Sequence, residues 1–240
     1  MMTFEEFWNK VHRRLLKMRF QPIRVFFFHQ VSDVFEPETM WECDWTQTEQ
    51  FKRNILALKK KYAFVSLQEA NRRLSTDKFR IKRYAALTSD DGWASLKNII
   101  PWLAEQEIPI TLFLNPYYMD GIHCQSRPTE KLLTVDEVKD MVERYAPFVT
   151  IASHGWTHAD SMKMGRQEFE ENVAKSEAFL KDMPGKIPFY AFPFGRRIQY
   201  QNEYLLEHSL IPVFADDGKN VNNSNCIHRE LLDGKVMVKE

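Results

Sequence analysis

Apolar residues along the chain fall into two patterns, short continuous runs and longer stretches in which they recur at helical spacing. Continuous runs are typical of strands buried on both faces, and recurrence every three or four residues is typical of amphipathic helices. The runs predict strands at 24–29, 64–67, 84–88, 108–115, 148–153, 189–194 and 211–215. The helical spacing predicts helices at 3–19, 46–61, 96–105, 134–145, 166–181 and 199–208, with a further one beginning at about Gln68.

Strands and helices alternate about seven times, and no repeat or low-complexity linker divides the chain. This alternation predicts an α/β fold whose mostly parallel sheet is closed, or nearly closed, into a barrel. A length of 240 residues is within the range of one barrel-like domain. We therefore expect a single domain over residues 1–240, with the amphipathic helix at 3–19 at its N-terminal end.

That first helix has two unlike sides. The apolar side carries Phe4, Phe7, Trp8, Val11, Leu15 and Leu16, and the other side carries His12, Arg13, Arg14, Lys17 and Arg19. Such a helix more often packs against the domain that follows it and less often lies on a membrane surface. Peripheral membrane contact through this helix is therefore the second interpretation.

Composition and charge exclude several classes of protein. Apolar residues make up 44% of the chain and charged residues 28%, as in globular proteins. Basic and acidic residues each number 33, so nothing indicates a nucleic-acid partner. Cys43, Cys124 and Cys226 lack the spacing of a zinc ribbon or a disulfide framework, which fits a reducing compartment. Without the apolar run of a signal peptide or transmembrane segment, a cytoplasmic protein is expected.

Two adjacent carboxylates stand at the end of one predicted strand. Asp90 and Asp91 follow the run 84–88 and precede Gly92. In α/β folds, ligands bind at the carboxyl ends of the strands. Adjacent carboxylates repel each other, so one can bind a cation while the other acts as a base. A solvated Asp-Asp-Gly turn is the alternative.

A pair of histidines stands at the end of another predicted strand. His154 ends the run 148–153, and His158 follows four residues later. At this separation two imidazoles can bind one ion if the segment between them turns as a helix, which Gly155 permits. Together with Asp91, the pair makes a two-histidine, one-carboxylate metal site with open coordination positions.

Several stretches, in this order and at this spacing, resemble a known family. Leu87 to Gly92 (LTSDDG), Ser153 to His158 (SHGWTH) and Ala191 to Gly195 (AFPFG) look like the first three motifs of the NodB-type polysaccharide deacetylases, carbohydrate esterase family 4. Phe28 to Val31 (FHQV) looks like the Tyr-His-x-Val signature of the branch that includes the poly-N-acetylglucosamine deacetylases. The resemblance spans roughly residues 24–217.

This resemblance implies a fold, a reaction and a set of site residues. The fold is a distorted (β/α)7 TIM-like barrel, and the reaction removes acetyl groups from sugars with one divalent metal ion, usually Zn2+. By resemblance, Asp91, His154 and His158 bind the metal and Asp90 is the general base. Such a metal polarises the acetyl carbonyl and activates water, and the backbone N–H of Phe194 would bind the oxyanion.

The sequence departs from the family pattern at several positions. Ser89 replaces an aromatic or aliphatic residue, and Ala191 stands where many members carry an arginine that braces the base. The C-terminal Leu-x-His motif that supplies the acid in most members has no clear match, because His228 is expected to be a surface or strand histidine. In the branch with the Tyr-His-x-Val signature the acid comes from that early histidine. His29 is therefore the expected proton donor, with a hydrogen bond to a neighbouring loop as its alternative role.

Aromatic residues beside the motifs are candidates for stacking on sugar faces. The residues expected to contact the substrate are Phe192, Pro193, Phe194, Trp93 and Trp156. The segment 117–127, which begins with Tyr117 and Tyr118, lacks periodicity and is the best candidate for a substrate loop. About half of these aromatic residues beside the motifs are expected to be core residues only.

The expected function is a metal-dependent hydrolase that removes the acetyl group of an amino sugar in a carbohydrate or glycoconjugate. Two other classes share parts of the pattern. A non-catalytic carbohydrate-binding protein on the same scaffold would not need Asp90. A non-haem Fe(II) oxygenase usually takes its carboxylate from beside the first histidine, whereas Asp91 lies far upstream. The sequence indicates neither the sugar nor the oligomeric state.

Overall fold

The computed structural model describes residues 2–19, 21, 23–33, 45–77, 80–119 and 132–232, and for 12–19 it describes the backbone alone. The helices are α1 (Phe4–Arg19), α2 (Thr48–Lys59), α3 (Leu67–Thr76), α4 (Leu96–Glu105), α5 (Val135–Arg144), α6 (Arg166–Leu180) and α7 (Gln199–Glu207). The strands are β1 (Ile23–Phe28), β2 (Gln30–Val31), β3 (Trp45–Thr46), β4 (Ala63–Phe64), β5 (Tyr84–Ser89), β6 (Ile110–Leu114), β7 (Val149–Ser153), β8 (Lys186–Ala191), β9 (Ile211–Phe214), β10 (Ile227–His228) and β11 (Glu230–Leu231). Short 3-10 turns lie at η1 (Pro116–Tyr118), η3 (Ser161–Lys163) and η4 (Pro193–Gly195).

The main sheet is parallel and nearly closes on itself. Its strands follow the order β10, β9, β8, β7, β6, β5, β1, β11, and β4 pairs with β5 beside this path. The two ends of the path, β10 and β11, are separated in the chain by Arg229 alone. The backbone of this short segment bonds to both ends of the sheet. Arg229 N donates to Phe214 O of β9, and Leu232 N donates to Phe27 O of β1. This confirms the predicted α/β barrel of parallel strands.

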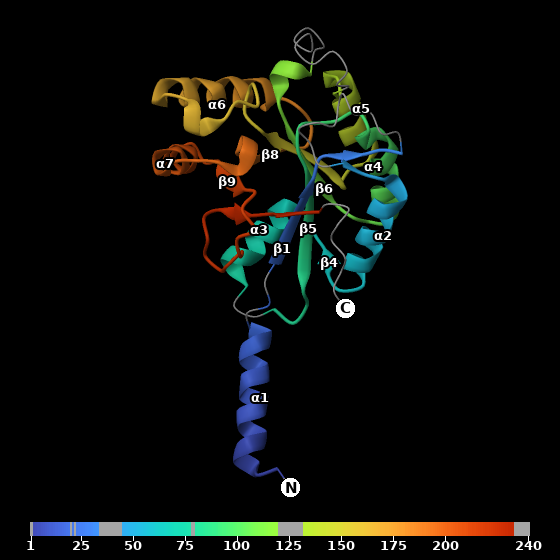
Figure 1. The fold of residues 1–240 in the computed structure, drawn as a ribbon, viewed down its shortest axis with the longest axis vertical. Coiled ribbons are helices and arrows are strands. Elements are labelled where there is room, and N and C mark those ends of the chain that lie inside the picture. The colour runs from blue at the N-terminus through green and yellow to red at the C-terminus, as the bar shows by residue number, and fades with distance from the viewer. Residues whose placement is uncertain are drawn as a thin grey trace.

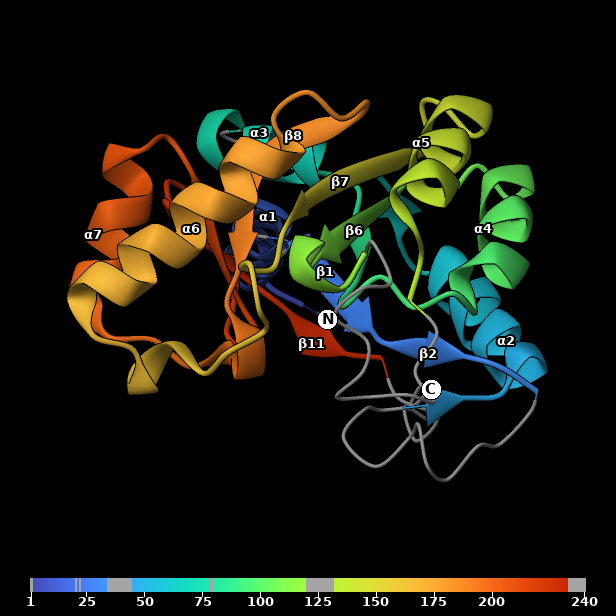
Figure 2. The same cartoon turned by 90° about the horizontal axis from the view of Figure 1, so that it is seen from above.

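Two groups of helices cover the outside of the barrel, and α3 packs separately against β1 and β5 (Figures 1 and 2). On one side, α2, α4 and α5 pack on the sheet through residues such as Ile55, Ile99 and Val138, which belong to one buried apolar cluster. On the other side, α6 and α7 pack on β8 and β9 through Phe169 and Leu205. The helices therefore leave the carboxyl ends of the strands as one common edge.

Residues 2–10, at the start of the first helix, are exposed, so the expected packing on the domain that follows is not found for these described side chains. α1 extends away from the amino ends of the strands (Figure 1). Its apolar side chains Phe4, Phe7 and Trp8 are 77%, 50% and 53% exposed. Among the described helices, none has both the length and the apolar character needed to cross a membrane.

The capping-box pattern in the sequence correctly predicts the start of one helix and not that of another. Thr134 and Glu137 form the capping box that opens α5. Thr46 and Glu49 have the same spacing, but Thr46 is part of β3, and α2 begins with Gln47 as its N-cap. Pairing between β2 and β3, which the apolar pattern does not predict, therefore overrides the cap.

Candidate metal centre

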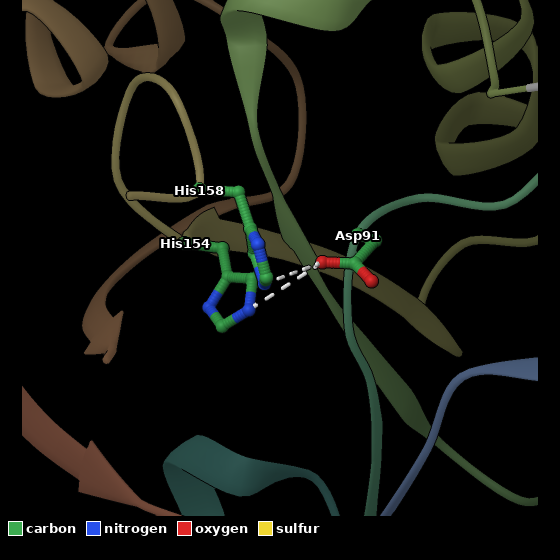
Figure 3. A group of neighbouring side chains, drawn as sticks. All are labelled: Asp91, His154 and His158. Atoms are coloured by element: carbon green, nitrogen blue, oxygen red, sulfur yellow. Dashed lines mark ion pairs between the residues drawn. The ribbon is translucent and has the colours of Figure 1, made fainter. Parts of the chain in front are cut away.

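Three side chains with metal-binding atoms meet at the carboxyl ends of β5 and β7 (Figure 3). Asp91 follows β5, and His154 and His158 follow β7. Oδ1 of Asp91 lies 3.5 Å from Nε2 of His154 and 3.3 Å from Nε2 of His158. The structure thus brings together the three residues that the sequence predicts as ligands.

These distances fit a tetrahedral metal ion. Zinc binds imidazole nitrogen and carboxylate oxygen at about 2.0–2.1 Å, so neighbouring ligand atoms in a tetrahedron lie about 3.3 Å apart. The two distances from Asp91 Oδ1, 3.3 and 3.5 Å, are close to that value. Three protein ligands leave a fourth position for water or substrate, which is the pattern of catalytic zinc sites.

His154 is held in the protonation state that a metal ligand needs. Its Nδ1 lies 2.9 Å from Ala191 O, and since a carbonyl only accepts, Nδ1 carries the proton. Nε2 therefore turns a lone pair toward Asp91. Burial lowers the pKa of His154 to about 4, which outweighs the opposing effect of the nearby carboxylates. The ring is neutral at neutral pH, and a cation is the natural partner for the facing lone pairs.

The segment between the two histidines is not helical, contrary to the expected turn. Gly155 has φ 78° and His158 has φ 50°, both in the left-handed region. A side chain at Gly155 would also meet Asn172 Oδ1 at 2.9 Å. A helix would place the imidazoles one turn apart along an axis, whereas this irregular loop brings His158 back toward Asp91.

Two buried asparagines hold that loop. Asn115, just after β6, donates to His154 O at 2.6 Å. Asn172 of α6 accepts from Trp156 N at 2.8 Å and donates to Thr157 Oγ1 at 3.1 Å. Because these amides replace the hydrogen bonds that a helix would supply, they fix the positions of both histidines. No pattern in the sequence predicts either asparagine.

Asp91 is oriented by its own backbone and by a neighbouring indole. Its φ is 69° and that of Gly92 is 77°, so the chain turns sharply after β5. Strained non-glycine positions of this kind are concentrated at functional sites. Trp93 Nε1 donates to Asp91 Oδ2 at 3.3 Å, which leaves Oδ1 facing the histidines. Burial raises the pKa of Asp91, but the nearby His158, His154 and His29 outweigh this effect and lower it.

Asp90 is paired with an arginine that sequence analysis missed. Arg229 donates through Nη1 to Asp90 Oδ1 at 2.6 Å and through Nη2 to Oδ2 at 2.8 Å. Its side chain is 0% exposed, and Nη1 also donates to Thr88 Oγ1. Burial raises the pKa of Asp90, but the charge and hydrogen bonds of Arg229 prevail and hold it well below its usual range.

Arg229 thus occupies the bracing role left open by Ala191. The available signal was the alternation of the last strand, in which Ile227, Arg229 and Leu231 share one face. An arginine between two apolar inward positions indicates a buried charge that needs a partner. His228 lies in β10, as expected for a strand histidine.

His29 lies near both carboxylates. Its charged form lowers the pKa of Asp90 and of Asp91, although burial and other neighbours have larger effects on both groups. Its backbone O accepts a hydrogen bond from Ser89 Oγ at 3.4 Å. Its Nδ1 is buried and has no hydrogen-bond partner among the described residues. The structure therefore places His29 close to Asp90 and Asp91, and its role as proton donor stays a prediction.

The predicted substrate residues differ in exposure. Trp93, Phe192 and Pro193 are buried, whereas the Phe194 ring is 56% exposed and lies 4.8 Å from the His158 ring. Trp156 is partly exposed. Phe194 is therefore the best placed of the five to stack on a sugar, and the sugar contacts remain predictions. Most of the predicted loop at 117–127 lies outside the described residues.

Comparison with solved structures shows the same fold in several deacetylases. Streptococcus pyogenes deacetylase PplD, solved with acetate, matches with a TM-score of 0.75 and 18% identity over 89% of this chain and 93% of that chain. IcaB from Ammonifex degensii matches with a TM-score of 0.70 and 18% identity over 88% of this chain and 92% of that chain. A de-N-acetylase from Aggregatibacter actinomycetemcomitans matches with a TM-score of 0.69 and 18% identity over 89% of this chain and 95% of that chain. No curated protein sequence matches.

The family comparison agrees with the site. The family model described as polysaccharide deacetylase matches residues 78–210, which is more than half of the chain and includes Asp90, Asp91, His154 and His158. The chain belongs to the polysaccharide deacetylase family.

Proposed function

We propose that the protein is a zinc-dependent hydrolase that removes the N-acetyl group of an amino sugar in a carbohydrate or glycoconjugate. Family membership supports carbohydrate deacetylation in general. The observation that carries the finer proposal is the combination of the metal-binding group Asp91, His154 and His158 with an ionised carboxylate, Asp90, next to it in the chain. In this proposal residues 1–240 form a single catalytic domain, with α1 at its N-terminal end.

A divalent metal ion would supply the Lewis acid and activate the attacking water. A bound Zn2+ would polarise the acetyl carbonyl and lower the pKa of its bound water. Asp91, His154 and His158 would hold it, because their nitrogen and oxygen donors and their spacing suit a tetrahedral ion. The chain's own residues carry out the remaining steps.

Asp90 acts as the general base in this proposal. Its carboxylate takes the proton of the attacking water, and Arg229 keeps it ionised and fixes both oxygens. Each carboxylate oxygen has a second lone pair, so the contact with Arg229 leaves room for that proton. The backbone N–H of Phe194 would donate to the oxyanion of the tetrahedral intermediate.

His29 acts as the general acid. Breaking the C–N bond of an amide expels an amine, which is a poor leaving group unless it is protonated. The charged form of His29 acts on both carboxylates, and its buried Nδ1 has no hydrogen-bond partner among the described residues. Asp90 could instead return the proton that it took from water, so a variant of His29 decides between the two.

Two observations support an N-acetylated sugar as substrate, one for the acyl group and one for the sugar ring. One protein of the same fold is described as a de-N-acetylase, and this makes an acetamido sugar the first substrate to test. The exposed ring of Phe194 beside His158 could stack on the apolar face of a pyranose. The reaction would then cleave the carbon–nitrogen bond of a linear amide.

Two competing functions share parts of the site. A carbohydrate-binding protein without activity would have no use for the buried pair of Asp90 and Arg229, which is costly to desolvate. A non-haem Fe(II) oxygenase would use the same donor set, but it needs no second carboxylate beside the metal. Release of acetate, measured together with bound metal, distinguishes the three.

We also propose where the enzyme works. The cysteine pattern favours the cytoplasm, where the substrate would be a biosynthetic glycan intermediate or sugar conjugate. The exposed Phe4, Phe7 and Trp8 of α1, with the basic residues of the same helix, suit the surface of an anionic membrane. Cell fractionation that placed the protein outside the inner membrane would overturn the cytoplasmic location.

Acetate release from a panel of acetylated amino sugars tests the proposed function. We expect acetate from the zinc-loaded protein and none after chelation. Acetate release that continued without metal would contradict the proposal.

A further inference from the structure

A second group of reactive side chains lies at residues that the metal centre does not use. Cys226 precedes β10, His228 ends β10, and Asp216 follows β9. The Nδ1 of His228 lies 2.7 Å from Oδ1 of Asp216, and its Nε2 lies 3.7 Å from Sγ of Cys226. Because Arg229 points into the barrel, its neighbour His228 points to the outer side, where it packs on Phe214.

The positions of the protons follow from the partners. A carboxylate only accepts, so Nδ1 of His228 donates to Asp216 and Nε2 turns its lone pair toward the thiol. Burial raises the pKa of Asp216, but the hydrogen bonds from His228 and Gly218 N, with the charge of Arg197, lower it overall. Cys226, His228 and Asp216 thus follow one another as thiol, base and orienting carboxylate, which is the arrangement in enzymes with a cysteine nucleophile.

Other uses of these three residues fit less well. The thiol and the carboxylate face opposite edges of the imidazole, so they cannot bind one metal ion together with a single ring nitrogen. Cys226 is a free, partly exposed thiol, and Ser224 Oγ lies 3.2 Å from its sulfur. Ser224 Oγ also donates to Cys226 O and accepts from Cys226 N, so it fixes the backbone at the cysteine. A thiol that only filled space would not need the facing lone pair of His228.

We propose that Cys226 is a nucleophilic thiol that reacts with hydrogen peroxide, with His228 as its base. As the sulfur attacks one peroxide oxygen, Nε2 of His228 takes the thiol proton and the O–O bond breaks. The sulfur is oxidised to a sulfenic acid, and the departing hydroxide takes the proton back from His228 to form water. One thiol and one peroxide thus give one sulfenic acid and one water.

The test measures how fast Cys226 is oxidised in the full chain. Hydrogen peroxide is added with dimedone as a trap for sulfenic acid, and the peptide that contains Cys226 is quantified by mass spectrometry. We expect Cys226 to react about 10²-fold faster in the folded protein than in the urea-unfolded protein. His228→Gln should remove this difference, and Asp216→Asn should reduce the rate about tenfold.

A matched control separates the base from any histidine near the surface. His208 is also exposed, and its Nδ1 donates to Tyr204 O, away from the cysteine, so His208→Gln should leave the rate unchanged. The proposal is overturned if folded and unfolded Cys226 react at the same rate, or if His228→Gln reacts like the unchanged chain. Should His228→Gln fail to fold, two measurements still test the proposal. Equal rates for folded and unfolded Cys226, or an Asp216→Asn rate equal to that of the unchanged chain, would overturn it.

Discussion

Arg229 donates to both carboxylate oxygens of Asp90, at 2.6 and 2.8 Å, across 139 positions of sequence. Arg229 stands between β10 and β11, at the point where the barrel closes. The strand that closes the barrel therefore also sets the charge and orientation of the proposed base. This relationship links the fold to the chemistry.

Arg229→Lys tests that link. Lysine keeps the charge but replaces the planar fork with one ammonium group, so the two-point contact is lost. We expect kcat to fall about 10- to 100-fold because the base is less well placed. Since Arg229 holds the pKa of Asp90 down, weakening the contact should move the acid limb of the kcat profile to higher pH.

The chain offers a matched control for this substitution. Arg24 makes the same kind of fork with Glu230 on the outer side of the neighbouring strands. Arg24→Lys should leave kcat and its pH profile unchanged. Equal losses in the two variants would show that the effect of Arg229 comes from the fold and not from Asp90.

The buried His154 should make the stability of the metal-free protein depend on pH. Its pKa is lowered from 6.5 to about 4 on folding, so the unfolded chain takes up the proton first. The stabilisation is complete above pH 6.5 and is lost as the pH falls toward 4, by about 3 kcal/mol in total. Urea unfolding in EDTA at pH 7, 6 and 5 measures this slope.

His154→Gln should have a shallower slope than the unchanged chain over the same pH range. The exposed His208 serves again as the control, and His208→Gln should retain the slope of the unchanged chain. If His154→Gln and the unchanged chain lost stability in parallel, His154 would not be the buried neutral group.

His29→Ala distinguishes a proton donor from a structural histidine. If His29 protonates the leaving amine, the variant should keep its metal and lose about 10² to 10⁴ in kcat on an amide. The loss should be much smaller on an O-acetyl ester, whose alkoxide leaves more easily. Equal losses on both substrates, or loss of metal, would count against the role.

The exposed side of α1 predicts binding to anionic vesicles. Trp8→Glu should weaken co-sedimentation with such vesicles at least about tenfold, because burial of an aromatic side chain contributes ~1.5–3 kcal/mol. Ile81, which is also exposed but lies outside α1, provides the control Ile81→Glu, which should bind like the unchanged chain. Failure of the unchanged chain to bind, or equal binding by all three proteins, would refute the proposal.

The parts of the site that could be predicted are those with a local signal. Asp91 lies two residues after β5 and His154 directly after β7. Because parallel strands end at one edge, their meeting follows from the order of elements. The helices and strands of the barrel were predictable for the same reason. Short strands such as β2 and β3, of two residues each, are below the length at which a pattern is visible.

The parts of the site that the sequence does not predict depend on contacts between distant segments. Arg229 reaches Asp90 only because the last strand closes the barrel, and a sequence pattern carries no record of that pairing. Asn172 holds the loop of His158 from a helix, through the backbone of Trp156. The left-handed φ of His158 and Asp91 likewise follows from tertiary contacts that local propensity cannot show.

The central claim is that one metal ion at Asp91, His154 and His158 supports deacetylation with Asp90 as base. The most direct test measures bound zinc and acetate release on the same samples of the unchanged chain, Asp91→Ala and the matched variant Asp90→Asn. We predict one equivalent of zinc and acetate release for the unchanged chain, zinc without acetate for Asp90→Asn, and neither for Asp91→Ala. A full equivalent of zinc in Asp91→Ala, or acetate release by the metal-free protein, would contradict the claim.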